Sequence, residues 1–162
     1  MTGEMAVRSA RPLDVETIVR LNNEFAAEGL MLRRTIDSVM AAVQDYLVVT
    51  NDAGEIVACA YLKEYSPSVA EVAGVAVSRA AHGCGLGKVV VAAVEALAAR
   101  RGIYDVFALT KQPEFFSAIG YQRVDRARYP EKIRRDCLAC ARRFACNEIC
   151  FSKNLRLNAL AA

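Results

Sequence analysis

The chain has 162 residues, of which 54% are hydrophobic and 24% are charged, and its formal net charge is +3. This balance is typical of a folded globular protein rather than a disordered one, and the length suits one domain with a sizeable core. A net charge this small does not by itself indicate a protein that binds nucleic acid.

In the first half of the chain, hydrophobic spacing and turn residues predict a strand, two helices and three further strands. Pro12 suits the first position of a helix, and apolar residues recur at helical spacing from Val15 to Phe25. The segment 51–54 is typical of a hairpin turn, and 65–67 is expected to interrupt the sheet before it resumes. The predicted strands are 5–8, 46–50, 56–62 and 70–77, and the predicted helices are 12–28 and 35–43.

In the second half, an amphipathic helix pattern covers 86–101, and Gly102 lies just past its end. The remaining predicted elements are strands 106–109, 121–124 and 149–152 and a short helix 113–119. The sequence shows no repeat or linker, so we expect a single domain over 1–154 and a C-terminal tail over 155–162. These elements predict an α+β fold in α/β/α layers, with a mixed, mostly antiparallel central sheet of about six or seven strands flanked by helices.

The first ten residues carry charges and no apolar run, so they do not resemble a signal peptide. The most apolar window, 86–99, is interrupted by Lys88 and Glu95 and is too short to cross a bilayer. We therefore expect a cytoplasmic protein with no membrane partner and no nucleic-acid partner. In that compartment the six cysteines are not expected to form structural disulfides.

The segment 82–87 combines three glycines with the start of the long helix. Glycines let the backbone turn tightly and leave its N–H groups uncovered, and a helix N-terminus adds unpaired donors and a positive dipole end. Such a loop can bind a phosphate or pyrophosphate, and a purely structural turn is the alternative. It does not match a Walker-type loop, because His82 and Val89 occupy the first glycine and the hydroxyl positions. It does not match the dinucleotide fingerprint either, because Gly87 comes one residue early.

With Gly85 and Gly87, this loop resembles the Q/R-x-x-G-x-G/A motif of the GCN5-related N-acetyltransferase (GNAT) family, although His82 stands where Arg or Gln is usual. The order of elements is also similar to that family, since 71–77 looks like its fourth strand and 115–121 like its late helix-to-strand corner. The resemblance implies a GNAT fold and acetyl-CoA as cosubstrate, with loop amides on the pyrophosphate and the fourth strand on the pantetheine arm. The residues that it implies in binding are Val75, Ala76, Val77, His82, Gly83, Cys84, Gly85, Leu86, Gly87 and Lys88.

The same resemblance gives Glu71 the position where the family often has its general base. An α-amine is mostly protonated near neutral pH, and a carboxylate can take its proton directly or through water. The alternative is an ordinary exposed strand carboxylate. Many relatives protonate the leaving thiolate with a tyrosine where this chain has Phe116, so that role stays open, with Ser117 and Thr110 as candidates. Transfer is expected to be direct, in a ternary complex.

Several segments, including 107–110, 129–133 and 136–137, further resemble the acetyltransferase domain of the N-acetylglutamate synthases. This resemblance implies transfer to the α-amino group of L-glutamate, the first step of arginine biosynthesis. A dianionic acceptor needs cationic donors, and arginine offers a two-pronged one. The residues implied beside the acceptor are Arg33, Arg34, Thr110 and Lys111, and the basic segment 132–135 adds further candidates.

Four cysteines, Cys137, Cys140, Cys146 and Cys150, cluster near the C-terminus. Their spacing is compact enough for a tetrahedral metal, so we predict a structural zinc site. The alternatives are reduced cysteines in a basic loop, a disulfide formed on oxidation and, for Cys150, a core side chain on the last strand. Acetyl transfer does not require this metal.

Two other functions stay open at this point. The same fold could acetylate another amine, such as a protein N-terminus, a polyamine or an antibiotic. A non-catalytic regulatory module that binds coenzyme A or a metal is the second, which Phe116 favours and Glu71 argues against. The sequence is compatible with a homodimer.

Overall fold

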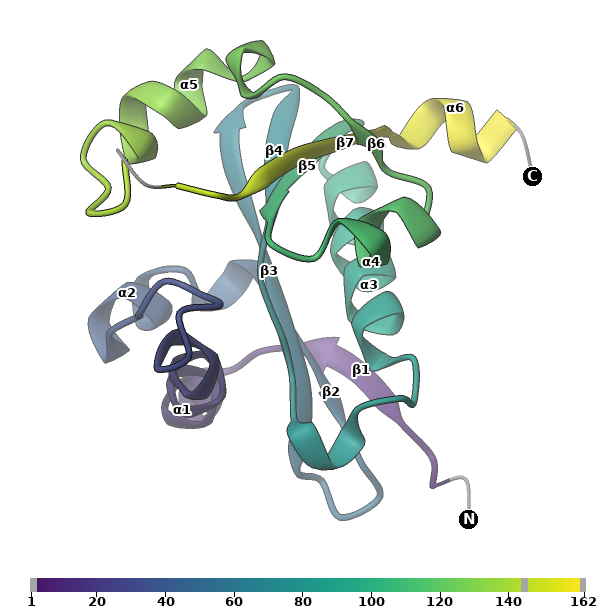
Figure 1. Ribbon diagram of the computed structural model, residues 1–162. Coiled ribbons are helices and arrows are strands. Elements are labelled where there is room, and N and C mark those ends of the chain that lie inside the picture. Colours follow the sequence, from purple (N-terminus) through teal and green to yellow (C-terminus); the bar gives the residue numbers. More distant parts are fainter. Residues whose placement is uncertain (1–2, 144–145, 161–162) are drawn as a thin grey trace. The chain divides into compact units, whose positions relative to one another are not determined.

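Seven strands form one hydrogen-bonded sheet in the computed structural model, which describes residues 3–143 and 146–160 (Figure 1). In order across the sheet they are β1 (Ala6–Ser9), β2 (Tyr46–Thr50), β3 (Ile56–Ser66), β4 (Val69–Val77), β5 (Asp105–Thr110), β7 (Ile149–Asn154) and β6 (Gln122–Arg123). The pair β4–β5 is parallel, whereas β1–β2, β2–β3, β5–β7 and β6–β7 are antiparallel. This arrangement confirms the predicted α+β fold with a mixed, mostly antiparallel sheet flanked by helices.

The chain divides into two compact units. The first runs to Lys63 and also contains Val72–Leu97, and the second consists of Glu64–Glu71 and the residues from Ala98 onward. In the first unit, β2 is buried along its whole length and pairs with β1 and β3, so that Val48 lies opposite Arg8 and Cys59. Its β-branched and aromatic residues are those that pack well in a pleated sheet.

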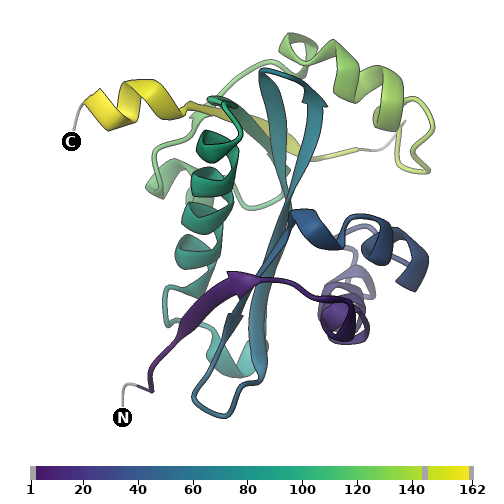
Figure 2. The same cartoon turned by 180° about the vertical axis from the view of Figure 1, so that it is seen from behind.

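Helices cover both faces of the strands of the first unit. α1 (Val15–Ala26) and α2 (Ile36–Ala41) lie on one side and α3 (Leu86–Arg100) lies on the other, in both views (Figures 1 and 2). α1 is amphipathic and buries Ile18 and Phe25, among others, in the core of this unit. The short 3-10 turns of this unit are η1 (Pro12–Asp14), η2 (Val43–Asp45) and η3 (Arg79–Ala81).

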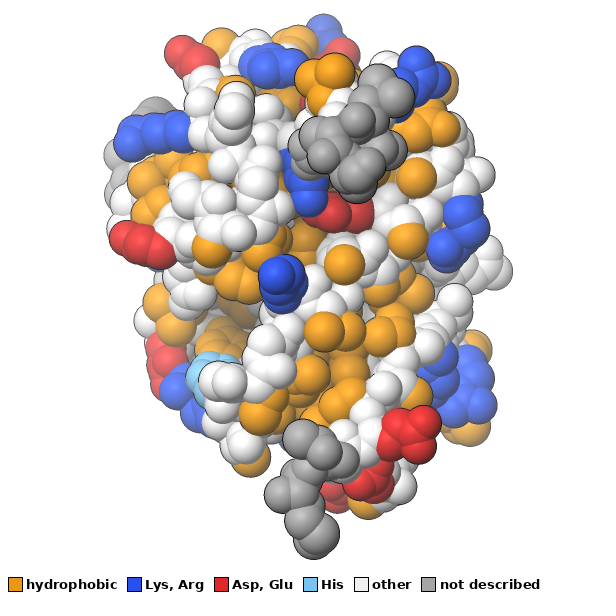
Figure 3. Space-filling model, turned by 90° about the vertical axis from the view of Figure 1, so that its right-hand side faces the viewer, with side chains coloured by type: hydrophobic (Ala, Val, Ile, Leu, Met, Phe, Trp, Pro, Cys, Tyr) orange, Lys and Arg blue, Asp and Glu red, His pale blue; other side chains and the backbone are white. Residues whose placement is uncertain are grey.

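α3 is apolar on more than one face. Val90 and Val94 are buried, whereas Val89, Ala92 and Ala96 are exposed. Figure 3, which shows the side of the molecule on which α3 lies, has hydrophobic side chains at much of the visible surface. The homodimer that is compatible with the sequence stays a prediction.

β5 is the central strand of the second unit. It pairs with the first residues of β4 and with β7, so that Phe107 lies opposite both Glu71 and Ser152. The ring of Phe107 stacks on that of Tyr129 with 4.1 Å between centroids and lies 5.6 Å from that of Tyr65. The helices and turns of this unit are α4 (Pro113–Ala118), η4 (Arg126–Arg128), α5 (Pro130–Lys132), the π-helix η5 (Ile133–Cys137) and α6 (Leu155–Leu160).

The structure differs from the predicted elements at three places. β3 continues through Tyr65 to Ser66, because the buried Tyr65 ring belongs to the aromatic cluster around Phe107, so the predicted interruption is only a tight turn. The segment after β6, for which no element is predicted, contains η4, α5 and η5. The segment that was expected to be a C-terminal tail contains the helix α6. That the chain is a single domain stays a prediction. No helix in the described ranges has the length and hydrophobicity needed to cross a membrane.

Gly74 provides a test of the packing in the first unit. Its φ is +62°, and a Cβ at this position would lie 3.0 Å from Tyr61 Cδ1. We expect Gly74→Ala to lower the free energy of unfolding by about 2 kcal/mol or more, because backbone strain of about 1–3 kcal/mol is joined by a steric clash. Urea denaturation measures this loss.

Gly54→Ala is the matched control, because Gly54 has a φ of +77° but open space around its Cβ position. It should lose only the strain part. Equal losses in the two variants would contradict the close approach of Tyr61 to β4.

Candidate functional site

The glycine loop connects the end of β4 to α3 in the first unit. Gly83 and Gly85 have φ values of +82° and +75°, so both glycines adopt the left-handed conformation that other residues rarely adopt. α3 begins at Leu86, immediately after Gly85. The first N–H groups of an α-helix have no acceptor within the helix, so this turn supplies donors and a positive dipole end next to the loop. The arrangement has the features of an anion-binding site.

His82 braces this loop instead of extending from it. Its Nε2 lies 2.8 Å from the carbonyl oxygen of Val77 and donates to it when that nitrogen carries the proton. Its ring also stacks at 6.1 Å on Phe25 of α1. The guanidinium of Arg79 lies 5.1 Å from the ring centroid of Phe25, and Arg79 also forms an ion pair with Glu28. Sequence analysis missed Phe25, Arg79 and Glu28, since their contacts with the loop region cross from one element to another.

The other residues predicted to bind coenzyme A lie beside the loop in the same unit. Val75, Ala76 and Val77 form the end of β4, and Lys88 is exposed in the first turn of α3. Cys84 is exposed as a free thiol. The structure therefore brings the predicted loop and strand residues together.

Arg34 of the first unit packs on one face of a pair of stacked tyrosine rings. Its guanidinium lies 4.5 Å from the ring centroid of Tyr61, and that ring stacks on Tyr46 at 4.6 Å. Asn23 fixes the backbone of Arg34 by donating to its carbonyl and accepting from its N–H, both at 2.9 Å. Arg33, by contrast, has an exposed side chain.

Tyr46 is 1% exposed, and its hydroxyl has no hydrogen-bond partner among the described residues. Burial raises the pKa of this phenol well above its usual value, although the nearby Arg34 opposes the shift. Tyr46 is therefore a neutral phenol that is buried beside Tyr61 and Arg34. Sequence analysis missed both tyrosines, because their strands read simply as core.

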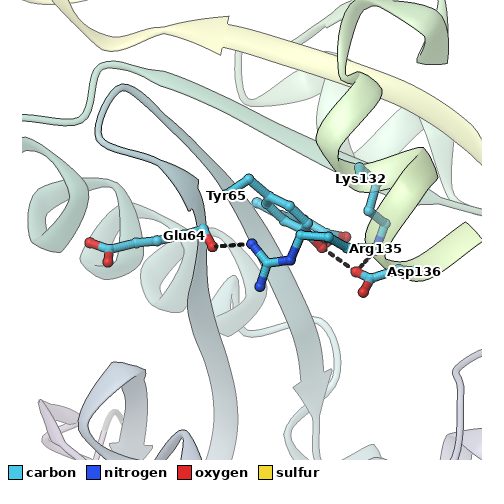
Figure 4. A network of polar contacts seen from close by, with 6 residues as sticks. Glu64, Tyr65, Lys132, Arg135 and Asp136 are labelled. Atoms are coloured by element: carbon cyan, nitrogen blue, oxygen red, sulfur yellow. Dashed lines mark hydrogen bonds and ion pairs between the residues drawn. The ribbon is translucent and has the colours of Figure 1, made fainter.

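Glu71 lies in a buried polar cluster of the second unit, part of which Figure 4 shows. Its Oε1 accepts from Lys132 Nζ at 2.9 Å and from the Tyr65 hydroxyl at 3.1 Å. Lys132 also donates to Asp136 Oδ2 at 3.0 Å, and Tyr65 contacts that same oxygen. The Glu71 side chain is 8% exposed, so the alternative of an ordinary exposed carboxylate is wrong. We call Glu71, Tyr65, Lys132 and Asp136 the Glu71 cluster.

The charges of the Glu71 cluster follow from its contacts. Burial alone would lower the pKa of Lys132, but Glu71 and Asp136 outweigh it and raise that pKa above its ordinary value. Burial and the same two carboxylates raise the pKa of the Tyr65 phenol. Lys132 is therefore an ammonium and Tyr65 a neutral hydroxyl over the whole physiological pH range.

This cluster includes part of the basic segment that was predicted to lie beside the acceptor, and the acceptor site itself stays a prediction. Lys132, from the basic segment 132–135, is committed to Glu71 and Asp136. Arg135 donates to the backbone carbonyl of Glu64 at 3.2 Å and covers the ring of Tyr65 (Figure 4). The sequence signal for this contact was the i, i+4 spacing of Lys132 and Asp136, which places two oppositely charged side chains on one helical face.

The residues predicted after β5 have structural contacts of their own. Thr110 is buried, and its Oγ1 accepts the N–H of Gln112 at 2.8 Å, which fixes the turn before α4. Lys111 is half-buried and Ser117 is exposed. Phe116 is buried at an edge-to-face contact with Tyr121, so this corner is core.

The predicted zinc site is wrong for the described residues. Among residues 3–143 and 146–160, no group of three His, Cys, Asp or Glu side chains could share a metal ion. Cys150 is buried in the aromatic cluster of the second unit, and Cys146 accepts from Arg126 Nη2 at 3.4 Å. Cys140 accepts the N–H of Arg142, and Cys137 lies on η5. Because β7 turns Cys150 into the core, that side chain is not available to the other three.

Comparison with known proteins places nearly the whole chain in a known group. The model of the acetyltransferase (GNAT) family matches residues 15–123. A protein of Chlorobaculum tepidum that is named as an uncharacterized N-acetyltransferase is 33% identical over 152 residues, covering 94% of this chain and 97% of that protein. An amino-acid acetyltransferase of Mycobacterium tuberculosis is 30% identical over 121 residues, covering 74% of this chain and 69% of that protein.

Among solved structures, the N-acetylglutamate synthase of Neisseria gonorrhoeae, complexed with coenzyme A and N-acetyl-glutamate, is similar with a TM-score of 0.84 and 25% identity. The similarity covers 96% of this chain but 36% of the synthase chain. This chain therefore spans about a third of that larger protein.

Lys132 gives a stability test of the Glu71 cluster. We expect Lys132→Met to lower the free energy of unfolding at neutral pH by about 3 kcal/mol or more, because the buried Glu71 and the half-buried Asp136 lose their cation. The raised pKa of Lys132 fixes the pH dependence. Its stabilisation is fully present below its ordinary pKa of 10.5 and is lost as the pH rises through the higher pKa of the folded state.

Urea denaturation of wild type and Lys132→Met should therefore show a constant difference from neutral pH up to the ordinary lysine pKa and a shrinking one above it. Arg134→Met is the control on the same segment, because its side chain is 69% exposed. It should change stability by less than about 0.5 kcal/mol. A Lys132→Met variant as stable as wild type would contradict the buried ion pairs.

Proposed function

The chain belongs to the acetyltransferase (GNAT) family, and on this basis we propose that it transfers an acetyl group from acetyl-CoA to the α-amino group of L-glutamate. The observation that carries the coenzyme part is the loop in which Gly83 and Gly85 adopt left-handed conformations directly before α3. The glutamate part is supported by relatives named amino-acid acetyltransferases and by the similarity to an N-acetylglutamate synthase.

In this proposal the glycine loop binds the pyrophosphate of acetyl-CoA through main-chain N–H groups. Because backbone amides hold the phosphates, the side chain of His82 does not have to contact them. Instead it binds the carbonyl oxygen of Val77, which keeps the loop amides in one orientation. The end of β4, from Val75 to Val77, offers backbone groups to the pantetheine arm.

Glu71 is the proposed general base. An ammonium group cannot attack a carbonyl, so the amine of glutamate first gives a proton to the Glu71 carboxylate. The amine nitrogen then bonds to the acetyl carbon, the carbon–sulfur bond breaks, and the coenzyme leaves as a thiolate. The nitrogen gives its second proton to water as the neutral amide forms, and the thiolate takes up a proton from water. The contacts of Lys132 and Tyr65 both go to Oε1 of Glu71, so neither of them uses Oε2.

The proposed acceptor site uses the arginines that precede α2. A glutamate side chain and its α-carboxylate need cations, and Arg33 and Arg34 supply two of them in adjacent positions. The stacking of Arg34 on Tyr61 and the Asn23 contacts orient one guanidinium, which lowers the entropy lost when it binds a carboxylate.

The loop is tested by calorimetric titration with coenzyme A. We expect Gly85→Ala to raise the dissociation constant about tenfold or more, because an alanine resists the φ of +75° and shifts the adjacent amides. Gly54→Ala, with the same kind of strain in the hairpin between β2 and β3, should bind like wild type. If well-folded wild-type protein shows no binding of coenzyme A or acetyl-CoA, the proposal fails.

The base and the acceptor are tested by thiol release from acetyl-CoA with a panel of amines. We expect the highest kcat/KM with L-glutamate, and Glu71→Gln should lower it about a hundredfold or more while coenzyme A binding is unchanged. Arg34→Gln should chiefly raise the KM for glutamate. Turnover with a polyamine or a peptide N-terminus in preference to glutamate would assign another acceptor, and binding without turnover of any amine would indicate a non-catalytic module.

A further inference from the structure

Lys132 is shared by two carboxylates instead of pairing with one. Its Nζ lies 2.9 Å from Glu71 Oε1 and 3.0 Å from Asp136 Oδ2. An ammonium that faced Glu71 alone would strongly favour the ionised carboxylate and would make Glu71 a weak base. A second carboxylate on the same ammonium opposes this effect, because it adds a negative charge and takes part of the attraction of the cation.

Tyr65, which lies on β3, contacts the same two carboxylates. Its hydroxyl lies 3.1 Å from Glu71 Oε1 and also contacts Asp136 Oδ2. A phenol has one proton to donate but can also accept, so it cannot donate to both carboxylates at once. When one carboxyl carries a proton, that carboxyl can donate to Tyr65 while Tyr65 donates to the other. The cluster therefore satisfies all of its contacts best when it holds one additional proton.

We propose that the Glu71 cluster works as one proton-accepting unit, in which Asp136 is a positioning residue that keeps Glu71 able to take a proton from the acceptor amine. This inference rests on the proposed function, in which Glu71 is the general base. Without the extra proton the unit has two carboxylates and one ammonium, and with it the unit is neutral.

The proton that leaves the amine passes through the Glu71 cluster to the solvent. The protonated amine loses one proton and Glu71 gains it. Rotation of the neutral Glu71 carboxyl group brings the protonated oxygen to Tyr65. Glu71 then donates to the oxygen of Tyr65, while the original phenolic proton passes to Asp136, so that Tyr65 is a neutral phenol before and after. Asp136 releases the proton to water, which fits its side-chain exposure of 26% against 8% for Glu71.

Two further titratable groups face Glu71, from the residue before β7 and from β7 itself. Burial raises the pKa of Glu148, and the charge of Glu71 adds to that shift. Burial raises the pKa of Cys150 to about 11. When ionised, Glu148 acts on Glu71 in the same direction as Asp136, but Asp136 is the carboxylate that shares the Lys132 ammonium with Glu71.

The test is the pH dependence of kcat/KM for the full chain, in which the rate falls on the acid side as the base becomes protonated. Asp136→Asn removes a negative neighbour, so Glu71 stays ionised to lower pH and the midpoint of the acid limb should fall by about one pH unit. Lys132→Met removes the cation, so the midpoint should rise by about one unit or more. A purely structural role would lower the rate without moving the two midpoints in opposite directions.

Glu131→Gln is the control, because it removes a carboxylate from the same segment at a site whose ion partner is Arg134 at 4.0 Å. It should leave the midpoint unchanged. Shifts in the same direction, or no shift in Asp136→Asn, would overturn the inference.

An infrared titration gives a readout that needs neither turnover nor Lys132→Met. The part of the protonated-carboxyl band that is missing in Glu71→Gln should appear on acidification of wild type and move to lower pH in Asp136→Asn. If the enzyme assay fails while this band behaves as expected, the proposed function is wrong and the proton-accepting unit stands. If turnover occurs and the band does not move, the unit is wrong and the function stands.

Discussion

The largely buried ion pairs of the Lys132 ammonium are the interaction on which the second unit depends. A buried charge is tolerated only when it is paired and hydrogen-bonded, and Lys132 meets this condition with Glu71 from β4 and Asp136 one helical turn further on. The two contacts tie the α5–η5 segment to the strand that carries Glu71. The ion pair between Lys132 and Glu71 therefore helps to fix the position of this segment on the sheet.

The first unit depends on a different constraint, the backbone conformation of a few glycines. At Gly83 and Gly85 positive φ angles turn the chain from β4 into α3, and at Gly74 the absence of a side chain lets Tyr61 approach β4. The loop and the tyrosine pair thus require glycine for separate reasons, one conformational and one steric. The ring of His82 adds a contact of its own, between the loop and the carbonyl oxygen of Val77.

Local features of the chain could be predicted from the sequence, and contacts between distant segments could not. The strands and the helix after the loop follow from periodicity and glycine positions, which act over a few residues. The pairing of Lys132 with Glu71 joins residues far apart in the chain, so spacing alone could not reveal it, and the basic segment read as a substrate site. The zinc prediction failed for a similar reason, because spacing says nothing about the side of β7 on which Cys150 lies.

The burial of Phe116 bears on which proton transfer limits the proposed reaction. A tyrosine hydroxyl at this position would lie in an apolar cluster with Tyr121 and Phe151, so the phenylalanine is the better core residue. Its absence as an acid is tolerable, because a thiol with a pKa of about 8.5 leaves readily as the thiolate and can be protonated by water. The amine has no such alternative, since it must lose a proton before it can attack. The chemical demand therefore falls on the base, and the structure concentrates its buried charges around Glu71.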